Sequence, residues 1–66
     1  MKYARVIVRD TKGEMVELRD APIYDEGMKA NKAIHFGRRV LADTINIVCR
    51  KFEGTGYTIT AEIIEQ

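Results

Sequence analysis

The chain has 66 residues, 45% of them hydrophobic and 32% charged, with a formal net charge of +1. This length allows one hydrophobic core, so we expect a single domain over residues 1–66. A single cysteine excludes an intramolecular disulfide, and with a single histidine it cannot form a structural zinc site. Because so small a domain buries only about 60% of its unfolded surface, self-association is the expected source of further stability.

The near-neutral total conceals an uneven distribution of charge. Residues 28–52 carry six basic side chains and one acidic one, a net charge of +5, and the rest of the chain carries −4. The first ten residues mix charged with apolar side chains, unlike the apolar core of a signal peptide or a membrane span. We therefore expect a cytoplasmic protein with a basic helix on an acidic body and no membrane contact.

A β-hairpin is predicted at the start of the chain. Residues 2–9 alternate between apolar and mixed positions with the period of a half-buried strand. Residues 10–13, Asp-Thr-Lys-Gly, are typical of a type I turn closed by a left-handed glycine, and a second strand follows over 14–19. If Asp10 pairs with Glu14, the register places Val8 opposite Val16 and Val6 opposite Leu18 on the buried face.

The same register places Arg5 opposite Arg19 on the open face of the sheet. Two like charges directly opposite each other destabilise a strand pair unless a neighbour neutralises them. Glu17 and Glu62 are candidates for that role, and an anion site between the two arginines is the alternative. We favour ion pairing, because exposed cross-strand charges usually pair or stay solvated.

The segment 27–52 is the only one long and periodic enough to form a substantial helix. Before it we expect a loop, because Pro22 ends the second strand and Asp25 is a natural N-cap with Glu26 in the first turn. After it, Gly54 stands where helices commonly end. The expected core-facing stripe of the helix consists of Ala30, Ile34, Gly37, Leu41, Ile45, Val48 and Phe52.

A third strand is predicted over residues 57–64, which alternate and are rich in β-branched side chains. The order of elements is therefore ββαβ. A right-handed crossover through the helix places the third strand beside the first. We predict an α+β domain with a three-stranded antiparallel sheet of order 2-1-3, one face covered by the amphipathic helix, and both edges open.

The residues needed for catalysis are largely missing. The chain has no serine, and Cys49 and His35 lie fourteen positions apart on the predicted helix, about 21 Å along its axis. A dyad between them requires two antiparallel chains, and the simpler expectation is a partly buried Cys49 and a solvent-facing His35. We therefore expect no enzyme, no catalytic residue, no metal site and no cofactor.

The apolar arc of the helix is wider than a small sheet needs to cover. It extends sideways from the main stripe into a shoulder that also contains small residues, where another backbone can approach. The alternative is that Phe36 packs under the loop with Ile23 and Tyr24. The expected interface for a homodimer or another partner consists of Phe36, Gly37, Val40, Thr44 and Ile47.

A basic face runs along the outside of the same helix. Arginine and lysine side chains so placed can bind phosphates or an acidic protein surface, although a solvated helix face explains them equally well. The residues of this expected face are Lys32, His35, Arg38, Arg39 and Arg50.

Two functional hypotheses follow. The first is a small non-enzymatic protein-interaction module, an inhibitor, adaptor or assembly subunit, that acts as a homodimer through the helix shoulder or an edge strand. The alternative is a protein that binds nucleic acid or an anionic ligand such as a nucleotide through the basic helix face.

Overall fold

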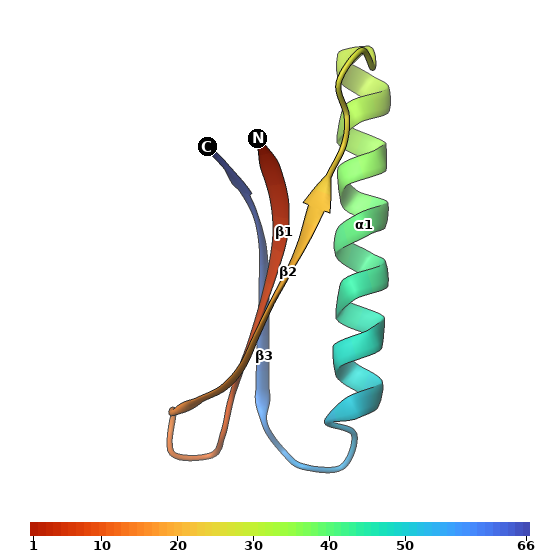
Figure 1. Cartoon of the computed structure of the whole chain (residues 1–66). Coiled ribbons are helices and arrows are strands. Elements are labelled where there is room, and N and C mark those ends of the chain that lie inside the picture. The colour runs from red at the N-terminus through yellow and green to blue at the C-terminus, as the bar shows by residue number, and fades with distance from the viewer.

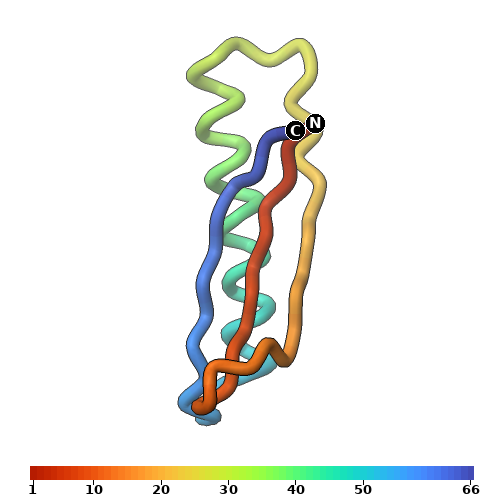
Figure 2. Tube along the Cα trace, turned by 90° about the vertical axis from the view of Figure 1, so that its left-hand side faces the viewer, coloured from red at the N-terminus to blue at the C-terminus, as the bar shows by residue number.

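The computed structural model describes residues 1–66 as three strands and one helix in the order ββαβ. The central strand β1 pairs antiparallel with both neighbours, so the sheet order is β2-β1-β3 (Figure 2). The helix α1 covers one face of this sheet and leaves the other bare (Figure 1). The predicted α+β fold is confirmed. The elements are β1 (Lys2–Arg9), β2 (Met15–Ile23), α1 (Ala30–Lys51) and β3 (Thr58–Glu65).

The pairing of the chain ends and the polarity of the helix complete the description of the fold. The ends of the chain pair with each other: the Met1 amine donates to the Gln66 carbonyl and the Gln66 N–H donates to the Met1 carbonyl, both at 2.8 Å. The single helix is not apolar over a sufficient length to cross a bilayer.

The turn of the β1–β2 hairpin has the predicted conformation. The Asp10 N–H donates to the Glu14 carbonyl at 2.8 Å, and the Gly13 N–H donates to the Asp10 carbonyl at 3.0 Å. Gly13 has a φ of 86°, which a residue with a side chain rarely adopts. The Asp10 side chain accepts hydrogen bonds from the backbone N–H groups of Lys12 and Glu14, which fixes the start of the pairing.

The predicted register beyond the turn is wrong by one residue. Arg9 lies opposite Met15 as predicted, but Val8 then lies opposite Glu17, so Val16 is an extra residue that forms a β-bulge in β2. Because side chains alternate between faces, this single insertion exchanges the two faces of β2 from Val16 onward. Val6 consequently faces Arg19 and not Leu18.

The shift also explains why β2 continues to Ile23 instead of ending at Arg19. It turns Ile23 toward the helix, where it is buried, and places Arg5 opposite Asp20 instead of Arg19. Pro22 does not end the strand, since β2 is an edge strand and an outward-facing position there needs no N–H donor.

The start of α1 also differs from the prediction. The helix begins at Ala30 with Lys29 as an N-cap that makes no side-chain hydrogen bond, and its first turn contains no acidic residue. Asp25 lies in a separate turn, where Gly27 adopts a φ of 79°, and its carboxylate pairs with Lys2 Nζ at 3.0 Å. Asp25 therefore joins the preceding loop to β1, and neither Asp25 nor Glu26 lies in the first turn of the helix. The predicted glycine stop is confirmed at the other end, where Gly54 has a φ of 78°.

The helix faces the sheet through the centre of its apolar arc. Gly37, Thr44 and Val48 are its buried residues, whereas Ile34 of the predicted stripe is half exposed. Val48 packs with Val6 and Val8 of the central strand to form the core. Around them lie partly buried side chains from both layers, namely Leu41, Ile45, Phe52, Tyr57 and Ile59.

Gly37 offers a test of this packing. A Cβ atom built at Gly37 would lie 3.6 Å from Ile63 Cδ1 and 3.8 Å from Ile23 Cδ1, which is ordinary van der Waals contact. We therefore expect Gly37→Ala to raise the free energy of unfolding by about 1 kcal/mol, the difference in helix propensity. Urea unfolding followed by circular dichroism measures this change, and Ala42→Gly on the exposed face should lose a similar amount. A loss of stability in Gly37→Ala would mean that the helix lies too close to Ile63 and Ile23 of the sheet to accept a methyl group.

Candidate interaction surfaces

The bare face of the sheet carries apolar side chains that the helix does not cover. We call this surface the open sheet face. Met15, Val16 and Leu18 are 54%, 44% and 42% exposed, and Leu18 lies directly opposite Ile7 of the central strand. An antiparallel sheet with one solvated face normally points apolar residues toward the core and polar residues outward. In this half of β2 the pattern is reversed, because the bulge turns Glu17 and Arg19 toward the helix side.

A charged row crosses the middle of the open sheet face. Arg5 donates two hydrogen bonds to the Asp20 carboxylate, from Nε at 2.9 Å and from an Nη at 3.0 Å. Its guanidinium carbon also lies 5.2 Å from the centre of the Tyr3 ring, and Glu62 lies opposite on β3. The arginine is neutralised within its own sheet, so the predicted ion pairing occurs, but with Asp20 as the partner.

Arg19 does not lie on the open sheet face. It occupies the helix side of β2, opposite Val6, with its Nε 3.8 Å from Glu17 Oε2. Glu17 also accepts a hydrogen bond from Lys51 near the end of α1. The predicted pair of facing arginines is therefore absent, and with it the geometry of an anion site between them.

The five residues predicted as a helix interface divide between the core and the surface. Gly37 and Thr44 are buried against the sheet, and the Thr44 hydroxyl donates to the Val40 carbonyl at 2.8 Å. Phe36 and Val40 are half-buried, and Ile47 is 52% exposed. Only the outer part of the shoulder is therefore available to a partner. The small residues meet side chains of the chain's own sheet.

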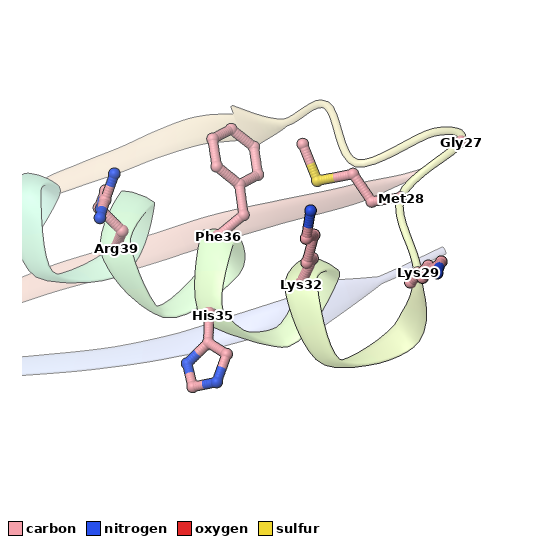
Figure 3. A pocket seen from close by; sticks show the side chains of 7 residues that line it. All are labelled: Gly27, Met28, Lys29, Lys32, His35, Phe36 and Arg39. Atoms are coloured by element: carbon pink, nitrogen blue, oxygen red, sulfur yellow. The ribbon is translucent and has the colours of Figure 1, made fainter.

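Part of the predicted basic face surrounds a hollow of about 720 Å³ beside the first turns of α1. We call it the basic hollow. Met28, Lys32, Phe36 and Arg39 extend from one side of the chain in Figure 3, with Lys29 at the start of the helix. His35 also borders the hollow but points to the opposite side in that view.

The remaining basic residues of the predicted face lie elsewhere. Arg38 borders a smaller cavity of about 200 Å³ between the helix and the sheet, with Ile34 and Ile63. Arg50 lies beside Cys49 near the far end of the helix, eleven residues or about 16 Å from Arg39. The predicted stripe is therefore not one site.

The other chemically reactive side chains are dispersed. Cys49 is exposed and not the partly buried residue that we expected. No three His, Cys, Asp or Glu side chains lie close enough together to hold a metal ion.

Comparison with known proteins gives no relative for this arrangement. No protein-family model, curated protein or solved structure shows a significant match to the chain. Function must therefore be argued from the surfaces themselves.

Sequence reasoning missed the apolar part of the open sheet face and the contribution of Met28 and Lys29 to the basic hollow. A signal for the first is present in β2, where Val16 and Leu18 occupy even positions but Ala21 and Ile23 occupy odd ones. A strand whose apolar residues change parity presents an apolar surface on each side, or contains a bulge.

The Arg5–Asp20 pair should make the stability of the fold depend on pH in the acidic range. Hydrogen bonds from Arg5 lower the pKa of the Asp20 carboxyl below its usual value, against an opposing effect of desolvation. Because the folded-state pKa is lowered, the pair stabilises the fold above the unfolded pKa of about 3.9 and loses this contribution as the pH falls through the folded value.

We expect Arg5→Gln to raise the pKa of Asp20 toward its ordinary value, measured by carboxyl NMR titration. Arg9→Gln removes a charge from the same strand, where Arg9 bonds only to the Gly13 carbonyl, and should leave that pKa unchanged. An unshifted Asp20 in the Arg5→Gln protein would contradict the pairing.

Proposed function

We propose that the chain is a small non-enzymatic interaction module that works as a homodimer, with the two copies joined through their open sheet faces. The observation that carries this proposal is the reversed pattern of β2, which leaves Val16 and Leu18 outside the single core. Leu18 pairs with Ile7 across the strands, but neither Leu18 nor Val16 is covered by any part of the monomer. Covering them by a second sheet would bury both.

The size of the exposed surface supports a second copy as the occupant. The chain exposes 4894 Å², whereas a compact monomer of 7.5 kDa exposes about 4,250 Å². Its radius of gyration is 13.1 Å, against about 11 Å for a compact domain of this length. The excess of about 650 Å² approaches the roughly 800 Å² that each partner buries in a stable interface.

The layout of the open sheet face also suits a two-fold contact. The charged row separates the Ile7 and Leu18 end from a second apolar end with Tyr3 and Ile64. A two-fold axis near the row would bring each apolar end against an apolar end of the other copy. It would also bring the Arg5 of each copy toward the carboxylates of the other, which compensates the charges.

Such a dimer would present both helices outward. The half-buried Val40 and the exposed Ile47 would remain free on each side for a different protein. This arrangement fits an inhibitor, adaptor or assembly subunit that contacts a partner twice, and we propose the reducing cytoplasm as its compartment. Occupying a partner needs surface complementarity and no reactive side chain.

The oligomeric state tests the proposal directly. We expect light scattering at micromolar concentration to give twice the chain mass of 7.5 kDa. Leu18→Glu places a charge in one apolar end of the proposed interface and should give the mass of one chain, because an unpaired buried charge is costly. Ile47→Glu is the matched control, since Ile47 is similarly exposed but lies on the helix, and it should remain dimeric.

Two results would contradict the proposal. One is a wild-type mass equal to a single chain at these concentrations. The other is separation of the chains by Ile47→Glu and not by Leu18→Glu, which would move the interface to the helix shoulder. Circular dichroism of both variants establishes that the sheet and helix remain folded.

A further inference from the structure

We infer that the basic hollow is a binding site for a nucleotide, with the phosphates held by Lys29, Lys32 and Arg39 and the base packed against Phe36. The site lies at the entry to α1 and uses none of the residues of the proposed dimer interface. The inference therefore does not depend on the oligomeric state.

The cations of the basic hollow are free to bind an anion. The ion pairs of the structure use Lys2, Arg5, Arg19 and Lys51, each with a carboxylate of the chain. None of the three cations of the hollow takes part in such a pair. An incoming phosphate would therefore not have to displace an internal partner.

No carboxylate lines the hollow, whose lining contains no Asp or Glu. Of the two carboxylates that precede Gly27, Asp25 is paired with Lys2, and Glu26 is exposed and forms no ion pair, so three cations face one unpaired neighbouring carboxylate. Arginine is suited to phosphate because its guanidinium donates two parallel hydrogen bonds, and the lysines add flexible point charges. The local field therefore favours a group with more than one negative charge.

The apolar part of the hollow narrows the class of ligand. Phe36 is half-buried, and its ring extends between Lys32 and Arg39, beside the Met28 side chain (Figure 3). An inorganic phosphate would leave this ring uncovered, whereas a flat base can stack on it. An acidic peptide supplies charge but no planar group. A nucleotide supplies both.

The dimensions agree with this choice. The volume of about 720 Å³ falls within the range of about 300 to 1,000 Å³ that is typical of small-ligand sites. Lys32 and Arg39 are seven residues apart, about 10 Å along the helix axis. A single phosphate cannot reach both without the side chains bending inward, but a base with an attached phosphate chain can.

The test is a titration of the purified protein with ATP, followed by amide chemical shifts in NMR and by calorimetry. We expect saturable binding of one ATP per chain that weakens as salt is raised to about 0.15 M. Lys32→Gln and Arg39→Gln should each weaken binding at least about tenfold, the usual effect of losing a charge-assisted hydrogen bond. Arg38→Gln and Arg50→Gln make the same change of charge outside the hollow and should alter the affinity less than about twofold.

A second comparison tests recognition of the base. Phe36→Leu keeps an apolar side chain but removes the ring, so it should weaken the binding of ATP and leave the affinity for pyrophosphate unchanged. The Leu18→Glu protein should bind ATP as the wild type does, because the open sheet face lies in the other layer. Unchanged ATP binding in this variant would show that the nucleotide site does not depend on dimerisation.

Three outcomes would overturn the inference. The first is the absence of ATP binding at low salt. The second is pyrophosphate binding as tightly as ATP, which would make the hollow a simple anion site. The third is binding only to single-stranded oligonucleotides, with an affinity that rises with length, which would make the helix a nucleic-acid surface.

Discussion

The extra residue at Val16 is the constraint on which the rest of the structure depends. It shifts the pairing of β1 with β2 by one position and so decides which side chains of β2 meet the helix. The shift buries Ile23 and exchanges a repulsive pair of arginines for the Arg5–Asp20 ion pair. The shift has a cost, because Val16 and Leu18 would lie under the helix in the register without the bulge. Full burial of such a side chain stabilises a fold by about 1.5 to 3 kcal/mol.

The bulge also explains the distribution of charge around the helix. Glu17 and Arg19 lie at the edge of the helix layer, where the carboxylate of Glu17 attracts Lys51. The sheet thereby pairs a cation at the end of α1 but none of the cations along its outer side. This division leaves one surface of the molecule apolar and another basic, and the two lie on opposite layers.

Much of the fold was predictable from local pattern. The number and order of the strands, the helix stop at Gly54 and the Asp10 turn each depend on residues that are close in sequence, and these were predicted correctly. The end of β2 was not, since the strand continues past Arg19 to Ile23. The register was not predictable from the turn alone, since a bulge is favoured by interactions formed far from it, at Arg5 and Ile23. The helix start was misplaced because Asp25 pairs with Lys2, which is distant in sequence. The error in the register also affected the candidate surfaces. Residues on the helix were placed on the right element, but those on β2 were assigned to the wrong face of the sheet.

The hydrogen bonds between Met1 and Gln66 bring the two ends of the chain together at one end of the sheet (Figure 1). A unit whose ends are adjacent can be inserted into a surface loop of a host protein without separating the two sides of that loop. New ends can equally be opened in the exposed turn at residues 11–13, at the opposite end of the hairpin. The module can therefore be displayed in two orientations, which makes it a practical scaffold for presenting either of its surfaces.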